Sequence, residues 1–229
     1  MKLAFLGTGS AFSIERYNGA VVVDDHLLLD AGAPLLPHMK RLDIDPGRID
    51  ALFLTHFHGD HILGLPPYLL YRAFVDHSRP FVIVGQEGVE EHLEGLFDLC
   101  WGAEWPGFRK QARLEYDEAR ADGEAAGVRY ETVVLRHGPT PTRGYRLHLD
   151  GRVLAYAGDT EATAELDQLV EGADIAITEA TGPSESAVHT SWEQARAVAA
   201  RHPKTRFLFN HVFTGKTENA VEDLDVVET

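Results

Sequence analysis

The sequence predicts an α/β (α+β) protein in which β-sheets are covered by helices on both sides. Short runs rich in Val, Ile and Leu recur along the chain and are bounded by Gly, Asp and Asn, which is the pattern of strands. Segments with helical periodicity lie between many of these runs. The first strands follow one another closely and the later ones alternate with helices, an order that favours sheets sandwiched between helix layers.

The elements can be placed in order along the chain. We expect strands at residues 2–7, 20–25, 26–32, 51–56, 81–85, 129–138, 145–158, 173–180 and 206–212. We expect helices at residues 34–42, 63–74, 88–102, 162–172 and 191–202. Asp150 and Gly151 predict a tight hairpin turn, because both turn positions need positive φ. Ser191, followed by Glu193 and Gln194, is typical of a capped helix start. Residues 109–127 are rich in Glu, Arg and Ala and are expected to form a solvated helix and loop.

The chain of 229 residues is 44% hydrophobic, and no linker or repeat divides it, so we expect a single domain spanning residues 1–229. Its apolar runs are too short to cross a bilayer, and its start does not resemble a signal peptide. We therefore expect a cytoplasmic protein with no membrane partner.

Cys100 is the only cysteine, which excludes internal disulfides and a thiolate cage for a metal. We expect its side chain to be a small buried hydrophobe. The net charge of −15 would repel a polyanion, so long nucleic acid is a disfavoured partner.

The most informative segment is "LTHFHGDHILGL", residues 54–65, in which polar side chains crowd together where a strand should end. Alternation along a strand directs His56 and His58 to the same side. Gly59 permits a turn, after which Asp60 and His61 would open the helix that begins with "ILGLP". Imidazoles crowded beside a carboxylate are reasonable when a divalent cation lies among them.

One loop with four donors cannot fill two metal sites, so further ligands must come from elsewhere. Three later strands each end at a candidate, namely His137 after "VVLR", Asp159 after "VLAYAG" and His211 after "RFLFN". Together with the first loop they supply five histidines and two carboxylates, enough for two metals with open positions.

At this point the sequence resembles the metallo-β-lactamase superfamily, whose members carry H-x-H-x-D-H followed by separate His, Asp and His residues. The resemblance covers nearly the whole chain and implies a four-layer αββα sandwich with a dinuclear centre. It implies that one ion is bound by His56, His58 and His137, that the other is bound by Asp60, His61 and His211, and that Asp159 bridges them. Asp30 in "LLLDAG" matches an acid that orients a ligand. Zinc is expected, although manganese or iron would accept the same donors.

A narrower resemblance is to ribonuclease Z and its relatives, through "LGTGSAF", "THFHGDHILGLP" and "HTSWEQARAVA". It implies that His189 helps to protonate the leaving oxygen, and that a homodimer is to be expected. Two features differ from ribonuclease Z. No basic arm for gripping transfer RNA is evident between Gly85 and Arg136, and "VFTGKTEN" with an acidic tail replaces the usual Ser-x-Arg-Tyr pattern after His211.

The sequence therefore predicts a metal-dependent hydrolase, in first place a phosphodiesterase that uses a metal-bridging hydroxide, with Asp60 and His189 as catalytic residues. Small or cyclic nucleotide-like diesters suit the acidic composition best. The alternative is a ribonuclease Z-type endonuclease that processes transfer RNA 3′ ends. Lactones, thioesters and sulfate esters, or a non-catalytic metal-binding role, are further alternatives. Trp101, Trp105 and Phe108 could wall a substrate pocket, although such residues more often pack in the core.

Overall fold

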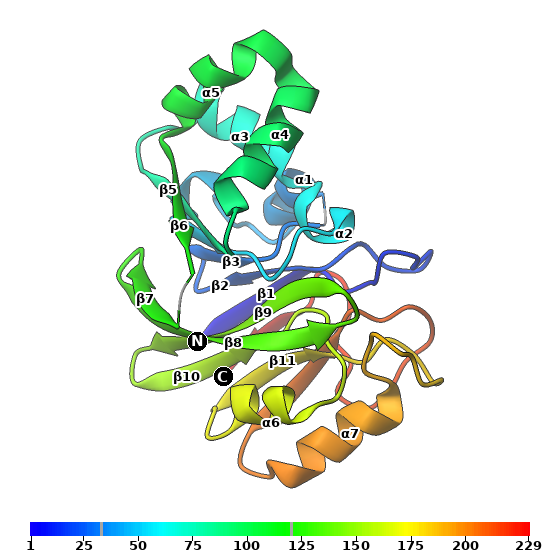
Figure 1. Cartoon of the computed structure of the whole chain (residues 1–229). Coiled ribbons are helices and arrows are strands. Elements are labelled where there is room, and N and C mark those ends of the chain that lie inside the picture. The colour runs from blue at the N-terminus through cyan, green and yellow to red at the C-terminus, as the bar shows by residue number, and fades with distance from the viewer. Residues whose placement is uncertain (33, 120) are drawn as a thin grey trace.

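Two β-sheets pack face to face in the computed structural model, which describes residues 1–32, 34–119 and 121–229 (Figure 1). The strands of the seven-stranded sheet lie in the order β13-β1-β2-β3-β4-β5-β6, and those of the six-stranded sheet in the order β12-β11-β10-β9-β8-β7. The strands are β1 (Lys2–Gly7), β2 (Ala20–Val23), β3 (Leu27–Leu29), β4 (Ala51–Phe53), β5 (Phe81–Gly85), β6 (Leu114–Glu118), β7 (Asp122–Ala125), β8 (Val128–His137), β9 (Thr140–Leu149), β10 (Arg152–Tyr156), β11 (Ile175–Glu179), β12 (Arg206–Asn210) and β13 (Val226–Glu228). Both sheets mix parallel and antiparallel pairs.

Helices cover the outer face of each sheet, which gives four layers and confirms the predicted αββα sandwich (Figure 1). Over the seven-stranded sheet lie α1 (Leu35–Arg41), α2 (Gly59–Ile62), α3 (Leu65–Phe74), α4 (Val89–Trp101) and α5 (Trp105–Ala112), with the short 3-10 turns η1 (Pro46–Arg48) and η2 (Gly102–Glu104). Over the six-stranded sheet lie α6 (Ala164–Val170) and α7 (Trp192–Arg201).

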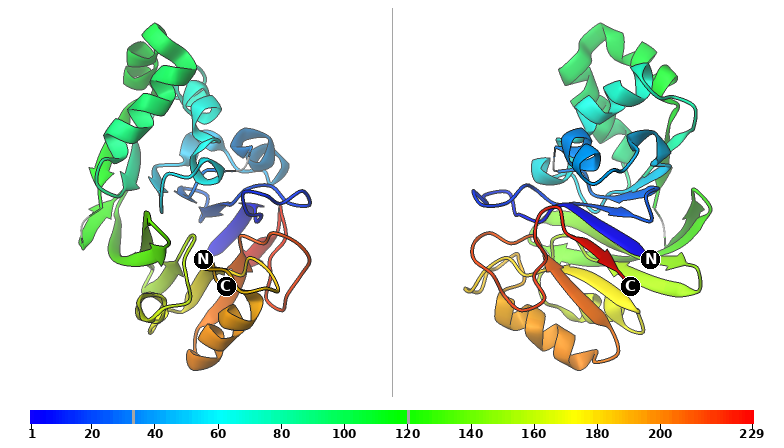
Figure 2. Two further views of the ribbon diagram at one scale, coloured as in Figure 1. Left: turned by 45° about the vertical axis from the view of Figure 1, so that its right-hand side comes forward. Right: turned by 180° about the vertical axis from the view of Figure 1, so that it is seen from behind.

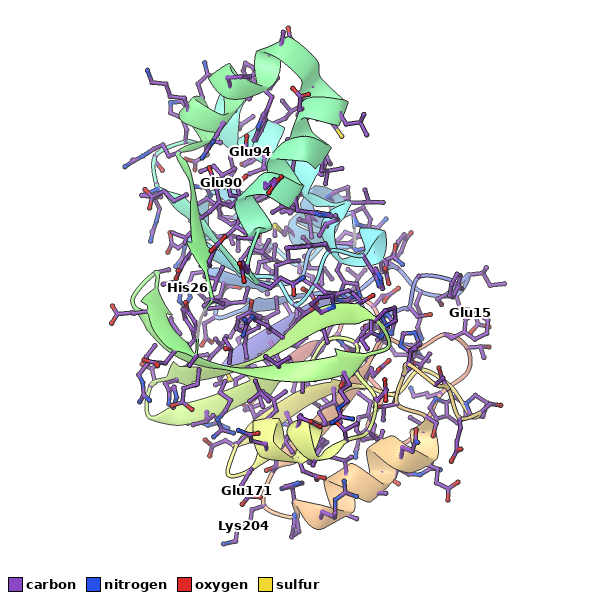
Figure 3. All side chains as sticks on the ribbon, viewed as in Figure 1. Glu15, His26, Glu90, Glu94, Glu171 and Lys204 are labelled. Atoms are coloured by element: carbon purple, nitrogen blue, oxygen red, sulfur yellow. The ribbon has the colours of Figure 1, made fainter. Side chains whose placement is uncertain are left out.

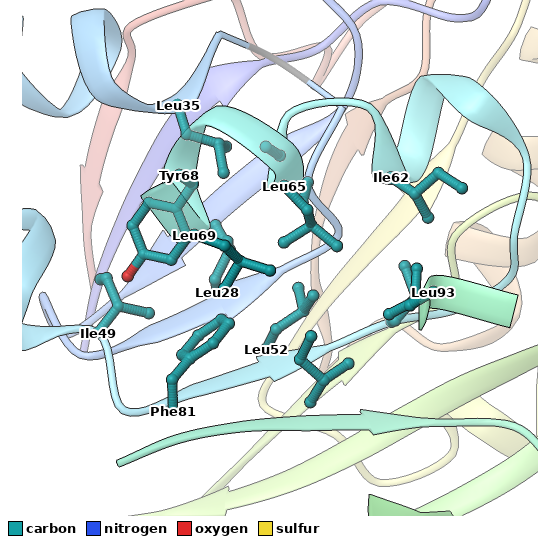
Figure 4. Packing of buried hydrophobic residues seen from close by; sticks show 14 of the residues in the cluster. Leu28, Leu35, Ile49, Leu52, Ile62, Leu65, Tyr68, Leu69, Phe81 and Leu93 are labelled. Atoms are coloured by element: carbon teal, nitrogen blue, oxygen red, sulfur yellow. The ribbon is translucent and has the colours of Figure 1, made fainter. Parts of the chain in front are cut away.

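Successive side chains of a strand point to opposite faces, so the seven-stranded sheet contributes residues to two apolar clusters. In β1, Leu3 and Phe5 belong to the apolar cluster between the sheets, whereas Leu6 belongs to the cluster under the helices. Figure 4 shows the outer cluster, in which Leu65 and Leu69 of α3 lie over the strands. Each sheet is therefore buried on both faces, which leaves the ends of the strands as places where polar side chains can gather.

Two local predictions are confirmed. Asp150 and Gly151 have φ values of 49° and 78° and join β9 to β10 in a tight hairpin. Ser191 caps α7, where its side chain accepts a hydrogen bond from the Gln194 backbone and the Gln194 side chain accepts one from the Ser191 backbone.

Other predictions are wrong in instructive ways. Residues 109–127 include two strands, β6 and β7, because Leu114 and Ala125 are buried while charged neighbours face solvent at the sheet edges. The acidic tail also forms a strand, β13, which pairs with β1 and brings the two chain ends together (Figure 2). Cys100 is exposed rather than buried, because it lies on the outer side of α4.

The motif loop also differs from expectation. Asp60 and His61 lie in the separate short helix α2, and the next helix begins at Leu65 instead of continuing from them. Among the residues that the structure describes, no helix has both the length and the apolar character needed to cross a bilayer.

Candidate metal centre

Four strand ends supply the side chains of the candidate site. The segment after β4 carries His56 and His58 and, in α2, Asp60 and His61. Three strands of the other sheet supply the remaining donors: β8 ends at His137, Asp159 follows β10 and His211 follows β12. Because the strands of both sheets end at one edge of the sandwich, residues from distant parts of the sequence meet there. Their nitrogen and oxygen atoms form groups within 4.8 Å of one another.

Asp159 lies between two groups of histidines. Its Oδ2 is 3.9 Å from His56 Nε2 and 3.7 Å from His137 Nε2. Its Oδ1 is 3.3 Å from His61 Nε2 and 3.1 Å from His211 Nε2. The two carboxylate oxygens therefore face different sets of nitrogen donors.

The remaining donors complete these two sets. His58 Nδ1 is 3.3 Å from His137 Nε2, on the Oδ2 side of Asp159. Asp60 Oδ2 is 3.4 Å from His61 Nε2 and 3.3 Å from His211 Nε2, on the Oδ1 side. The structure thus brings together all the ligand residues expected from the sequence, in the two groups that the resemblance implies.

The unsatisfied atoms of this cluster fit a bound cation. Within the described part of the chain, His56 Nε2, His61 Nε2 and Asp159 Oδ1 are buried without a hydrogen bond of good geometry. Leaving such atoms unpaired is costly, and a divalent cation would supply their missing partner. Histidine nitrogens and carboxylate oxygens are donors that divalent metals accept, so these clusters could bind metal.

Asp30 orients two of the histidines from behind. Its fully buried carboxylate accepts hydrogen bonds from His61 Nδ1 at 2.8 Å, from the Thr55 hydroxyl at 2.9 Å and from the Tyr156 hydroxyl at 2.7 Å. Thr55 Oγ1 in turn lies 3.1 Å from His56 Nδ1. These contacts occupy the Nδ1 atoms of His56 and His61 and leave both Nε2 atoms facing Asp159. Histidines that bind metals are usually oriented in this way, by a hydrogen bond at the nitrogen that does not bind the metal.

Two other histidines have outer partners that the sequence did not reveal. The His137 Nδ1 lies 2.8 Å from the Val188 carbonyl oxygen. The Thr140 hydroxyl lies 3.2 Å from His58 Nε2, so that His58 presents Nδ1 to the site. Neither contact could be expected from spacing, because both join segments that are remote in sequence.

The charges of the cluster favour a cation. Burial and the neighbouring His61 lower the pKa of His56 to about 2. At His211, burial opposes protonation, but the carboxylates of Asp159 and Asp60 outweigh it and raise the pKa to about 10. Burial likewise opposes ionisation of Asp159, yet His211 and His61 hold its pKa well below the usual range. The carboxylates thus favour protonation of the neighbouring histidines, and a bound metal would displace these protons.

His189 lies beside this cluster and is held by Glu179. Its Nδ1 is 3.0 Å from Glu179 Oε2 and 3.9 Å from Asp159 Oδ2. The fully buried Glu179 also accepts hydrogen bonds from the backbone of Thr160 and Thr190. Burial lowers the pKa of His189, but the hydrogen bond that His189 donates to Glu179, together with the negative charge of that carboxylate, outweighs burial and raises it.

Sequence reasoning did not identify Glu179. A signal was present, because this residue ends the buried strand β11 as Asp159 and His211 follow β10 and β12, its neighbours on either side. Because Glu179 stands at the carboxyl end of a buried strand, its position predicts a residue of the site, as the positions of Asp159 and His211 do.

A pocket of about 420 Å³ opens onto the cluster. Its lining residues are Ser10, Ala11, Phe12, His58, Asp60, His137, Asp159, Thr181, Val188, His189, His211 and Phe213. Trp101, Trp105 and Phe108 do not line it. Trp105 is buried in the core under α4 and α5, and the partly buried Trp101 and Phe108 pack against that core.

Comparisons with known proteins agree with this architecture. A ribonuclease Z from Limosilactobacillus fermentum is 27% identical over 305 aligned positions, which cover 100% of this chain and 98% of that protein. The crystal structure of the short form of human tRNase Z has a TM-score of 0.79 and 22% identity, covering 100% of this chain and 99% of that one. The metallo-β-lactamase fold protein YhfI from Bacillus subtilis has a TM-score of 0.81 and 18% identity, covering 100% and 98%.

The chain is therefore a metal-dependent hydrolase with the metallo-β-lactamase fold, similar to ribonuclease Z. The profile of a family described as "Anti-Pycsar protein Apyc1" matches residues 1–223. Because that match spans nearly the whole chain, this protein belongs to the Anti-Pycsar protein Apyc1 family.

Proposed function

We propose that this protein is a dinuclear phosphodiesterase that hydrolyses small or cyclic nucleotide-like diesters. The observation that carries the proposal is the position of Asp159, whose two oxygens face two separate donor groups. In this assignment one ion, expected to be zinc, is held by His56, His58 and His137. The second would be held by Asp60, His61 and His211, and the two oxygens of Asp159 would serve both ions.

Two bound divalent ions would supply hydroxide at neutral pH and stabilise negative charge on the substrate. Asp60 lines the pocket and, besides its role as a ligand, can accept a hydrogen bond from the attacking water and direct it. His189 lines the same pocket, and the carboxylate of Glu179 raises its pKa despite burial, which favours the protonated form. Its side chain can therefore donate a proton to the departing alkoxide.

Two features support a phosphodiester as the bond that is broken. A second donor group favours in-line phosphoryl displacement, in which both the attacking and the leaving oxygens carry charge. A histidine with a raised pKa beside the cluster suits an alkoxide leaving group, which needs a proton.

Transfer RNA processing is the second candidate, and the names of the relatives support it more directly than they support small diesters. The chain itself gives two reasons to prefer a small substrate. The pocket of about 420 Å³ has the size of a small-molecule site, and the net charge of −15 opposes a polyanion. The alignment with the Limosilactobacillus ribonuclease Z is also longer than this chain of 229 residues, so that relative has residues without a counterpart here.

The test is a substrate screen on protein whose metal content has been measured by elemental analysis. We expect metal-dependent hydrolysis of bis(4-nitrophenyl) phosphate and of cyclic mononucleotides, with little cleavage of precursor transfer RNA. Rapid cleavage of the transfer RNA at its 3′ end would establish the endonuclease instead. Hydrolysis confined to carboxylate, thioester or sulfate esters would refute the phosphodiesterase assignment.

A further inference from the structure

The loop after β1 carries a buried hydroxyl group without a partner. Ser10 lines the pocket and is only 3% exposed, yet within the described residues its Oγ makes no hydrogen bond. Its backbone is fixed on both sides, because its N–H donates to the Val212 carbonyl at 3.2 Å and its carbonyl accepts from Asn18 Nδ2 at 3.0 Å. A buried hydroxyl that is held this rigidly and is unpaired, in a residue that lines the pocket, is a candidate donor to a ligand.

The same loop also contributes an exposed apolar surface. Phe12 is 76% exposed and Phe213 is 44% exposed, and both line the pocket together with Ala11 and Val188. Large exposed aromatic side chains that meet at one pocket commonly mark a binding surface. The same pocket is also lined by the candidate metal ligands His58, Asp60 and Asp159, so apolar side chains and metal donors border one cavity.

Backbone contacts join both aromatic residues to the candidate metal site. Phe213 follows two residues after His211, and its N–H donates to the Thr181 carbonyl at 2.8 Å. The loop bearing Phe12 is anchored at its far end, where Arg16 donates to Thr8 Oγ1 at 2.9 Å and to the Val221 carbonyl at 2.6 Å. The tip between these anchors reaches the edge of the molecule, where Figure 3 labels Glu15.

We propose that these residues form the recognition side of the site. Ser10 Oγ donates a hydrogen bond to a non-bridging phosphoryl oxygen, and Phe12 and Phe213 bind a flat, uncharged ring on the esterified group. This inference rests on the proposed phosphodiesterase function and adds to it the residues that select among small diesters.

A flat ring fits these residues better than a charged or a purely polar group. The side chains that surround the pocket outside the donor cluster include two phenyl rings, a valine and an alanine, none of which can bind a charge by hydrogen bonds. Aromatic pairs gain stability from stacked or edge-to-face contacts beyond the area they bury.

The test compares two diesters that share one leaving group, phenyl 4-nitrophenyl phosphate and methyl 4-nitrophenyl phosphate. In the metal-loaded wild type we expect a higher kcat/KM for the phenyl ester. Phe12→Ala and Phe213→Ala should each lower the phenyl-to-methyl ratio of kcat/KM by about fivefold to tenfold. Ser10→Ala should lower kcat/KM for both esters by about 10- to 100-fold, without changing the ratio or the metal content.

Two neighbouring residues provide matched controls. Ile14 is 98% exposed on the same loop but does not line the pocket, and Ser13 has a buried, unpaired hydroxyl that does not line it either. Ile14→Ala and Ser13→Ala should therefore match the wild type with both esters. Hydrolysis of both esters with a ratio unchanged in the phenylalanine variants, or equal losses in Ser13→Ala and Ser10→Ala, would overturn the inference. Failure of the wild type to hydrolyse either ester would instead refute the proposed function.

Discussion

In the proposed dinuclear centre, each carboxylate oxygen of Asp159 would bind a different ion. Its Oδ1 and Oδ2 face different histidines, and the residue is only 2% exposed. We predict that Asp159→Ala loses bound metal and hydrolytic activity together. Elemental analysis and turnover of one sample provide the test, and a variant that keeps its full metal content would contradict the bridging role.

His189 should affect rate without affecting metal binding. It lies beside the donor cluster, and its Nδ1 is occupied by Glu179, so it has a different role from the ligands in our assignment. We predict that His189→Ala retains its metal and loses about 10²- to 10⁴-fold in kcat. Undiminished turnover of a phosphodiester by this variant would exclude the role of proton donor.

Glu179 should set the pH range in which His189 works. A proton donor is active only below its pKa, and Glu179 raises the pKa of His189 despite burial. Replacing Glu179 by Gln keeps hydrogen-bonding groups but removes the charge, so the pKa of His189 should fall. We predict that the alkaline limb of the kcat profile moves to lower pH in Glu179→Gln. An unmoved limb, with metal content unchanged, would show that Glu179 does not tune His189.

At the scale of the elements, close packing positions the short helix α2. A Cβ atom added at Gly32 would lie 1.5 Å from the carbonyl oxygen of Asp60, which no rearrangement of a side chain could relieve. We predict that Gly32→Ala displaces α2 and weakens metal binding by about tenfold or more. Gly19→Ala is the control, because a Cβ there meets nothing within 4 Å. A Gly32→Ala variant with the metal affinity of the wild type would contradict this view of α2.

The strand ends explain which site residues could be predicted from the sequence. His137, Asp159 and His211 could be predicted because each ends or closely follows a strand that contains a short apolar run. Thr140 and Val188 could not, because their contacts with histidines depend on the path of loops that spacing does not reveal. Among the elements, β6, β7 and β13 were missed because edge strands mix charged and apolar residues, which obscures their alternation.

At the scale of the whole molecule, a bound metal would connect the two sheets, because its ligands come from both. His56 and His61 follow β4 of one sheet, whereas His137, Asp159 and His211 follow strands of the other. Ligands from both sheets must stay together for metal to bind, so binding should stabilise the folded sandwich.

We therefore predict that removing the metal with a chelator lowers the Tm by about 5–10 °C, since ligand at 100 times its Kd contributes about 2.7 kcal/mol. Calorimetry provides the measurement. The Asp159→Ala variant, which should bind little metal, is the control and should show almost no response to the chelator. Equal shifts in both proteins would mean that the chelator acts elsewhere.

The most direct test of the account is the location of the metals by anomalous diffraction from crystals of the purified, metal-loaded protein. The account predicts two anomalous peaks on either side of the Asp159 carboxylate, one among His56, His58 and His137 and the other among Asp60, His61 and His211. A single peak, or peaks bound by other residues, would contradict it.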